Sequence, residues 1–427
     1  MALQKLGNPV ILESKVVAPQ NLLEVQILGW PVAWGYLMLG LLGAGTLLVF
    51  LVAGRSFPTA PSVAGAARYW LWLPLAWGLW QGLSAMQAEN ALLARTALWH
   101  FSACVAAFYF GWRVLGRAGE LRWFWVLLLV SFGVALLAGL DQHFGGLEET
   151  RRRFLELPPE TRAQFDSPEF RARMASNRIF STFVYPNVFA GAILLLLPLA
   201  VKAFWELGRH PRLSGTGRLA PWTMAGLPAL AGGACLYWSG SKAGWLIALV
   251  MLSVAFWRAP IRHTYKWLAV ALVAVAGLTG FFLKNAGYFQ RGATSATARM
   301  DYWRAAATVA REHPLLGGGP GNFFVFYRRL KPPEAEMARM AHNDYLQQAC
   351  DSGLPGGLLY AAFIGGSLVF LGRSATRHPL AGAVWLGLLG WSLQGFVEFG
   401  LYIPALAWPA FLLFGWSWAK AGESQAG

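Results

Sequence analysis

Length, composition and charge restrict the classes of protein to which this chain can belong. Of its 427 residues 56% are hydrophobic and only 13% are charged, against about 25% charged in a typical soluble domain. This composition excludes an ordinary soluble protein. The net charge of +15 does not indicate nucleic-acid binding, because the basic residues are spread over many short loops. The three cysteines, Cys104, Cys235 and Cys350, have neither metal-ligand spacing nor a disulfide pattern.

Long apolar runs recur along the chain. A bilayer core needs about 20 mostly apolar residues per helix, and every backbone polar group in lipid must be satisfied within the protein. We therefore predict an all-α polytopic membrane protein with eleven spans, or twelve if another lies near the start. The predicted spans lie at about 27–53, 69–87, 96–115, 123–141, 184–204, 222–238, 243–257, 267–283, 356–372, 380–400 and 403–418.

Basic residues occupy every second loop between these spans, and the positive-inside rule assigns such loops to the cytoplasm. They are Arg55 and Arg68; Arg113, Arg117 and Arg122; Lys202, Arg209, Arg212 and Arg218; Arg258, Arg262 and Lys266; and Arg373 and Arg377, with Lys420 in the tail. The opposite side receives the N-terminus and two long segments, 142–178 and 284–355. The first mixes Arg and Glu with Phe and Leu, so it is either an amphipathic surface helix or a solvated loop.

The segment from Lys284 to Pro355 carries nine basic against six acidic residues. Because Arg binds phosphate in a bidentate manner, this excess suggests an anionic headgroup as ligand; a solvated surface of paired charges is the alternative. Within it, Pro314-Leu-Leu-Gly-Gly-Gly-Pro-Gly-Asn-Phe323 is a glycine-rich turn without the order of a P-loop. Gly319 and Gly321 could approach a ligand closely, although a structural turn is the simpler interpretation.

Three further residue groups are predicted at the same side of the membrane. Ala341-His-Asn-Asp-Tyr-Leu-Gln-Gln348 suits a helix that begins near His342, where the positive helix end leaves the imidazole available as a base. A solvated bystander histidine is the alternative. Ser239-Gly-Ser-Lys-Ala-Gly244 places Lys242 at the membrane edge, as a functional cation or a snorkelling one. Arg178 and Asn187 flank the start of the fifth span.

Together these groups form an ordered series that resembles the O-antigen ligase and polymerase superfamily. The series is Arg178…Pro186-Asn187, Ser239-Gly-Ser-Lys242, Arg299…Tyr302-Trp303, Pro314-Leu-Leu-Gly-Gly-Gly-Pro-Gly321 and His342-Asn-Asp-Tyr-Leu346. The resemblance covers about 170–360. It implies a bacterial inner-membrane glycosyltransferase of the C-type (GT-C-like) fold, with its active site facing the periplasm and an undecaprenyl-diphosphate-linked glycan as donor, and neither cofactor nor metal.

Carried over residue by residue, the resemblance makes His342 the catalytic histidine and Arg299 the arginine before the aromatic pair. Lys242 falls where the family usually has Arg, which keeps the charge but loses the bidentate geometry. Arg178, Asn187, Asn343, Tyr345, Gly319 and Gly321 are the candidate substrate-binding residues. The chain would then divide into transmembrane regions 1–183 and 184–283, a catalytic loop 284–355 and C-terminal spans 356–427.

The function so implied is inverting, metal-independent transfer of a glycan from the lipid carrier to an acceptor hydroxyl, such as a lipid A–core sugar. The partners are this donor, the glycan acceptor and membrane lipid, with no nucleic acid. A repeat-unit polymerase or a protein O-oligosaccharyltransferase would share the same donor site. A transporter of lipid-linked glycans is the alternative from another class, but the ionisable residues His100 and Glu398 are predicted near span ends rather than at the midplane.

The loop charges predict that a reporter fused after Arg212 lies in the cytoplasm and one fused after Arg329 lies outside it. Paired fusions to a cytoplasmic-active and a periplasmic-active enzyme measure this directly. If both positions report the same compartment, the alternation of spans is wrong.

Overall fold

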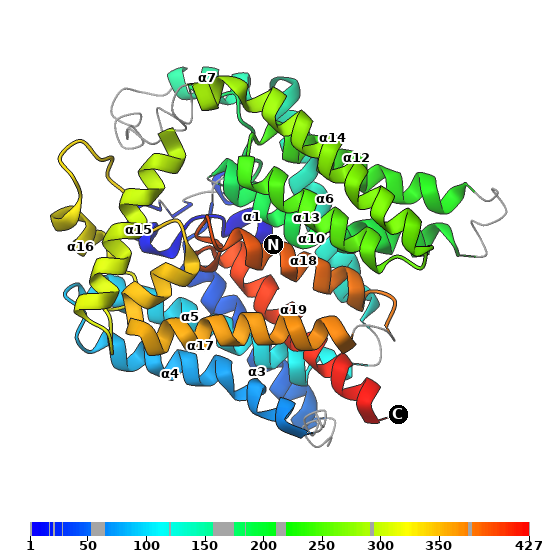
Figure 1. Ribbon diagram of the computed structural model, residues 1–427. Helices are drawn as coiled ribbons and strands as arrows, with labels where there is room; N and C mark the ends of the chain where they lie inside the picture. Colours follow the sequence, from blue (N-terminus) through cyan, green and yellow to red (C-terminus); the bar gives the residue numbers. More distant parts are fainter. Residues whose placement is uncertain are drawn as a thin grey trace.

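The computed structural model describes residues 2–16, 18–19, 22–27, 29–52, 65–118, 121–156, 175–183, 185–210, 219–290, 294–374 and 378–426. Over these residues the chain forms helices without any strand (Figure 1), which confirms the predicted all-α class. The elements are α1 (Ala2–Lys5), η1 (Val10–Lys15), α2 (Leu22–Ile27), α3 (Val32–Val52), η2 (Gly65–Trp72), α4 (Leu73–Ala85), α5 (Ala91–Arg113), η3 (Leu115–Arg117), α6 (Arg122–Asp141), η4 (Gln142–Gly146), α7 (Leu147–Glu156), α10 (Pro186–Gly208), α12 (Ala220–Trp238), α13 (Lys242–Arg258), α14 (His263–Gln290), α15 (Thr294–Glu312), α16 (Phe323–Leu330), α17 (Asp344–Ser374), α18 (Ala381–Gln394), η5 (Gly400–Tyr402) and α19 (Pro404–Ala426).

Each predicted span overlaps a helix, but not every helix is long and apolar enough to identify a span by itself. Among the described residues, six stretches are long and apolar enough to cross a membrane: Val32–Val49, Ala91–Arg117, Arg122–Glu156, Pro186–Gly208, His263–Gln290 and Asp344–Ser374. The molecule is therefore a multi-pass helical membrane protein. The other five of the eleven predicted spans correspond to α4, α12, α13, α18 and α19. Their assignment as spans depends on their places in the bundle rather than on length and composition.

Hydrogen bonds between helix ends show that α17 runs antiparallel to α18 and in the same direction as α13. At one end of the bundle, the backbone N–H of Asp344 at the start of α17 donates to the Gly395 carbonyl after α18, at 2.6 Å. At the other end Arg258, the last residue of α13, donates to the carbonyl of Gly372 near the end of α17, at 2.6 Å. The first end also carries α15 and α16 (Figure 1), and we call it the α15 end. The positions of Arg258 and Gly372 are consistent with basic loops gathered at the opposite end.

The N-terminal residues fold back onto the α15 end. The carbonyl of Leu3 accepts a hydrogen bond from the Thr182 hydroxyl at 3.0 Å, and the carbonyl of Leu6 accepts one from Ala405, at the start of α19, at 3.1 Å. Leu3, Leu6 and Val10 are buried in the main core. The described N-terminal residues thus lie at the end that carries the long 284–355 segment.

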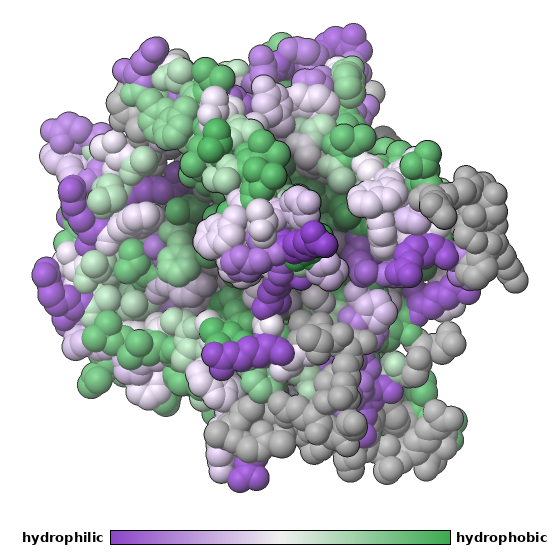
Figure 2. Space-filling model, turned by 45° about the vertical axis from the view of Figure 1, so that its right-hand side comes forward, coloured by the Kyte–Doolittle hydropathy of each residue, from purple (hydrophilic) through white to green (hydrophobic). Residues whose placement is uncertain are grey.

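Apolar helices of very different burial make up the bundle. The central pair, α5 and α19, packs closely because Gly111 faces the Leu412 backbone and Gly415 faces the Phe108 backbone. At the periphery, only 6% of the most apolar stretch of α14 is buried. Large hydrophobic side chains of this helix face outward. Figure 2 shows hydrophobic residues spread over much of the surface. A surface of this kind is stable when lipid covers it.

The segment 284–355 is largely helical rather than a loop. Helix α14 continues to Gln290, beyond the predicted end of its span at 283, and α15 and α16 follow before α17 begins. Tyr302 on α15 packs edge-on against Tyr327 on α16, with ring centroids 5.4 Å apart. This small aromatic core makes α15 and α16 a folded cap over the α15 end.

The other long segment begins as helix too. A kink at η4 separates α6 from α7, whose acidic and basic side chains pair within the helix, Glu148 with Arg151 and Glu149 with Arg152. Leu147 is buried at its start. The rest of the predicted amphipathic segment, including Phe165 and Phe170, lies outside the described residues.

Helix α17 is kinked at Ser352 and Gly353, and the glycine-rich turn docks there. Gly353 has φ +69° and ψ −179°, a conformation essentially confined to glycine. A Cβ at this position would also meet the carbonyl oxygen of Leu315. The backbone N–H of Leu354 donates to the Pro314 carbonyl at 2.8 Å. The kink therefore joins α17 to the segment that leads into the glycine-rich turn.

We predict that Gly353→Ala lowers the free energy of unfolding by more than about 1 kcal/mol, because the new side chain combines a strained φ with a backbone clash. The matched control is Gly365→Ala on the same helix, where a Cβ would meet nothing within 4 Å. The control should be neutral or slightly stabilising. Thermal unfolding of the detergent-solubilised variants compares the two, and equal melting temperatures would contradict this role of Gly353.

Candidate functional site

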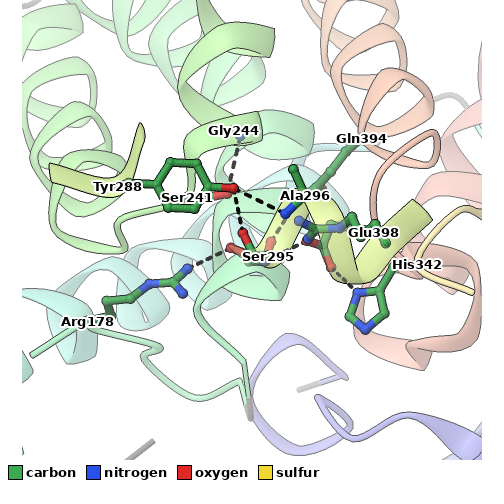
Figure 3. A network of polar contacts seen from close by, with 11 residues as sticks. Arg178, Ser241, Gly244, Tyr288, Ser295, Ala296, His342, Gln394 and Glu398 are labelled. Atoms are coloured by element: carbon green, nitrogen blue, oxygen red, sulfur yellow. Dashed lines mark hydrogen bonds and ion pairs between the residues drawn. The ribbon is translucent and has the colours of Figure 1, made fainter. Parts of the chain in front are cut away.

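A buried carboxylate lies at the centre of a polar cluster at the α15 end (Figure 3). Glu398 follows α18, and its side chain is only 5% exposed. Its Oε1 accepts hydrogen bonds from the Arg299 guanidinium and, at 2.5 Å, from the Asn187 amide. Its Oε2 lies 3.3 Å from Nδ1 of His342. One carboxylate therefore joins residues from α10, α15 and the segment before α17.

Arg178 extends this cluster toward the turn between α12 and α13. Its Nη2 donates to the Asn187 side-chain oxygen and its Nε donates to the Ser239 carbonyl, both at 2.7 Å. The turn permits this approach because Gly240 has φ +62°, and a Cβ there would lie 3.0 Å from Nε of Arg178. Ser241 then caps α13 by accepting from the Gly244 N–H at 3.2 Å, so Lys242 is the first residue of α13.

The charges of the cluster determine its protonation. Burial acts to raise the pKa of Glu398, but the hydrogen bond from His342 and the positive charges of Arg299, His342 and Arg178 outweigh it and lower the pKa. Burial lowers the pKa of Arg178, against the charge of Glu398, which raises it. A carboxylate with a lowered pKa stays ionised near neutral pH and can orient the neighbouring imidazole.

His342 is held in an uncommon backbone conformation, with φ +50°. The next residue, Asn343, caps α17 because its side-chain oxygen accepts from the Leu346 N–H at 3.0 Å. The imidazole packs between Phe399, at 4.7 Å between ring centroids, and Tyr302, at 5.7 Å. With Nδ1 facing Glu398, Nε2 of the partly exposed ring is left for another partner; strain of this kind is often retained at functional sites.

Tyr288 fixes the start of α15 beside Lys242. Its hydroxyl accepts a hydrogen bond from the Ala296 N–H at 3.2 Å and contacts the Ser295 hydroxyl at 2.9 Å. Lys242 Nζ lies 4.0 Å from the centroid of the same ring. Figure 3 shows Tyr288 on the same side of the cluster as Ser241. The helix that carries Arg299 is thus tied to the α13 turn that carries Lys242.

The structure brings four of the predicted site residues into one cluster: Asn187, Arg299 and His342 contact Glu398, and Arg178 joins them through its hydrogen bond to Asn187. Lys242 lies next to them, at the end of the same turn that binds Arg178.

The other predicted substrate-binding residues have structural partners instead. Asn343 is the helix cap described above. The Tyr345 hydroxyl donates to the Ser392 carbonyl at 3.0 Å, and its ring stacks on Phe396. The N–H groups of Gly319 and Gly321 donate to the carbonyl and the carboxylate of Asp351, at 2.9 and 2.8 Å. The geometry therefore gives these four residues a role in the fold and does not support direct contact with substrate.

Sequence reasoning missed Glu398, which it treated as an ionisable residue near a span end. The available signal was a carboxylate beside a strongly apolar run, since an ionisable residue in such a place is a functional candidate by default. The other such residue, His100, is fully buried in α5. Its ring contacts the Leu401 carbonyl at 2.7 Å and accepts from the Trp408 indole at 3.3 Å, so it is a structural histidine.

Two cavities lie beside the cluster. The larger, about 950 Å³, lies between α10, α12, α13 and α18 and is lined mainly by apolar side chains. The smaller lies between Lys242 and Lys284, and Leu236 and Trp245 line both. Across the described ranges no group of three His, Cys, Asp or Glu side chains could hold a metal ion.

Comparison with known families supports an assignment at the family level. A family model described as O-antigen ligase matches residues 227–361. No curated protein matches the chain. The matched region contains Lys242, Arg299 and His342 but neither Arg178 nor Glu398. The match supports membership of the O-antigen ligase and polymerase superfamily, and with it a glycosyltransferase-type, O-antigen ligase-like function in a multi-pass membrane protein.

The buried ion pair predicts strong energetic coupling between Arg299 and Glu398. Glu398→Leu leaves Arg299 without its carboxylate, and removal of one partner of a buried pair costs about 3–5 kcal/mol. The double variant Arg299→Met/Glu398→Leu should cost clearly less than the sum of the two single variants. Unfolding free energies of all four proteins in detergent form the cycle; additive losses would mean that the two charges do not interact.

Proposed function

We propose that this protein is a glycosyltransferase that moves a glycan from an undecaprenyl-diphosphate carrier to an acceptor hydroxyl, such as a lipid A–core sugar. The observation that carries the proposal is the shared carboxylate: Glu398 binds a candidate base, His342, and a candidate phosphate ligand, Arg299, at one buried point. Transfer from a diphosphate carrier needs both groups at one place. The family match supports the donor class at a coarser level.

In the proposed reaction Nε2 of His342 accepts the proton of the acceptor hydroxyl while its oxygen attacks the anomeric carbon. The bond from that carbon to the phosphate oxygen breaks, and its electron pair leaves with the diphosphate. The products are the glycosylated acceptor and undecaprenyl diphosphate. Glu398 orients the imidazole through Nδ1 and stabilises its positive charge after proton transfer, as the carboxylate does in other His–carboxylate pairs. Attack opposite the leaving group inverts the anomeric configuration.

Fixed positive charges compensate the charge of the leaving group. Arg299, Arg178 and Lys242 surround the point where the diphosphate would lie, and charges placed before the reaction stabilise a developing anion without reorganisation. The two extracytoplasmic segments lack an acidic D-x-D or E-x-D pair. We therefore propose that these side chains act without a metal ion.

The apolar cavity between α10, α12, α13 and α18 is a suitable place for the polyprenyl chain. Its volume of about 950 Å³ and its apolar lining match a long hydrocarbon, and it reaches Leu236 and Trp245 beside the cluster. A donor bound in this way keeps its tail within the bilayer and its sugar at the α15 end. We propose that the α15 end lies at the periplasmic face of the inner membrane, opposite the basic loops.

Ligation, polymerisation of repeat units and glycosylation of protein hydroxyls would use the same donor site. Deletion of the gene followed by glycan profiling separates them. Loss of polymer from the lipid A core, with long chains retained on the carrier, identifies a ligase. Accumulation of single repeat units identifies a polymerase, and unchanged glycans would contradict a role in this transfer.

The roles of base and phosphate ligand predict different kinetic losses. His342→Ala removes the base and should reduce turnover by about 10²–10⁴-fold while donor binding persists. Arg299→Ala should weaken donor binding as well as turnover, because the diphosphate is charged before and during the reaction. Transfer from a lipid-linked glycan is measured beside donor binding for each variant.

The control for this comparison is His313→Ala, because this exposed histidine at the end of α15 packs on Phe326 away from the cluster. It should transfer at the wild-type rate. Wild-type turnover by His342→Ala would refute the base assignment.

A further inference from the structure

Glu398 belongs to the short segment that joins α18 to η5, residues 395–401, which we call the Glu398 loop. Hydrogen bonds to the end of α18 secure its first half, because the N–H groups of Val397 and Glu398 both donate to the Gln394 carbonyl, at 2.9 Å. These bonds do not fix the loop relative to His342, which precedes α17. The 3.3 Å contact between Glu398 and His342 (Figure 3) therefore depends on a further link between the loop and the start of α17.

Asp344 supplies this link through two hydrogen bonds. Its own N–H donates to the carbonyl of Gly395, the first residue of the loop, at 2.6 Å. Its side-chain Oδ2 accepts from the N–H of Leu401, the last residue of the loop, at 3.0 Å. Asp344 thus holds the Glu398 loop on both sides of Glu398, and it lies only two residues after His342 in the chain.

The Glu398 loop closes tightly around the carboxylate of Asp344. This residue is only 1% exposed. A Cβ on Gly395 would lie 3.2 Å from its Oδ2, and a Cβ on Gly400 would lie 3.8 Å from the same atom. Its other oxygen, Oδ1, has no hydrogen-bond partner among the described residues. The loop therefore uses one oriented oxygen acceptor at position 344, which an amide can supply as well as a carboxylate.

A second attachment holds η5 to α17 without Asp344. Gln348 and Asp351 follow Asp344 on the same face of the helix at helical spacing. The Gln348 amide donates to the Tyr402 hydroxyl at 3.0 Å, and that hydroxyl donates to the Asp351 carboxylate. Because Tyr402 stays attached in this way, loss of the Asp344 side chain should loosen the Glu398 loop without detaching it from the bundle.

We propose that Asp344 is a positioning residue that sets the distance between Glu398 and His342 by holding the Glu398 loop against the start of α17. It acts through Glu398, which orients the imidazole, and not on the substrate. This inference rests on the proposed function, in which His342 is the base. A purely architectural role would lower stability, donor binding and turnover together, whereas a positioning role lowers turnover selectively.

The test compares Asp344→Ala with Asp344→Asn in the full-length protein in nanodiscs. Asp344→Ala removes the acceptor of the Leu401 N–H and should reduce turnover about tenfold or more, because small displacements of a catalytic group are costly. Binding of the lipid-linked donor should stay within about threefold of the wild type. Asp344→Asn keeps an oxygen at the same place and should retain turnover within about threefold.

The matched control is Ser367→Ala on the same helix. It removes another buried hydrogen bond, the one that the Trp418 indole donates to the Ser367 hydroxyl at 3.0 Å, and it should transfer at the wild-type rate. Melting temperatures accompany each variant. Wild-type turnover by Asp344→Ala would overturn the inference, as would a tenfold loss in a normally folded Asp344→Asn.

A double-mutant cycle shows whether Asp344 acts through Glu398. If it does, Asp344→Ala/Glu398→Gln should turn over within about twofold of Glu398→Gln alone, since residues that act as a unit are not additive. Losses that multiply would contradict the proposal.

Hydrogen exchange of the Glu398 loop gives a measurement that needs no activity. The loop should exchange faster in Asp344→Ala than in the wild type and Asp344→Asn, and equal exchange in all three would refute the link. If the wild type transfers no glycan, the proposed function fails, and this measurement still decides whether Asp344 holds the loop.

Discussion

The structure of the site depends on the burial of one carboxylate. An ionised group in a water-poor interior costs several kcal/mol unless it is paired and hydrogen-bonded, and Glu398 meets this requirement through Arg299, Asn187 and His342. These partners come from α15, α10 and the segment before α17. The carboxylate consequently fixes the relative positions of three parts of the chain that are far apart in the sequence.

The same arrangement explains how a base and a set of cations can coexist. Without an anion nearby, the positive charges of Arg178 and Arg299 would repel each other. Glu398 compensates this charge when no donor is bound, and it leaves Nε2 of the imidazole without a hydrogen bond in the described part of the chain. A diphosphate bound as proposed would meet donors already in place, which is the condition for electrostatic stabilisation at low reorganisation cost.

The sequence predicted the helical membrane fold, because long apolar runs report directly on the bilayer. It also named Arg178, Asn187, Arg299 and His342 as candidate site residues, and these four lie in one polar cluster. It could not predict that these residues gather around Glu398, since their contacts join segments far apart in the sequence, from Arg178 before α10 to Glu398 after α18, and no local pattern encodes such distances. Asn343, Tyr345, Gly319 and Gly321 cap a helix or bind neighbouring segments of the fold, and one sequence does not separate such roles from substrate binding. The sequence predicts a loop at 284–355, whereas α15 and α16 form a helical cap there, because the charged surface of this segment hides a small aromatic core.

The most direct measurement of the central claim is the anomeric configuration of the product. The purified wild-type protein, with EDTA present, is given an undecaprenyl-diphosphate-linked glycan and an acceptor saccharide, and the new linkage is assigned by NMR. A single displacement assisted by His342 predicts transfer with an inverted anomeric centre and release of undecaprenyl diphosphate. Retention of configuration, or transfer only after a divalent metal is restored, would contradict the account.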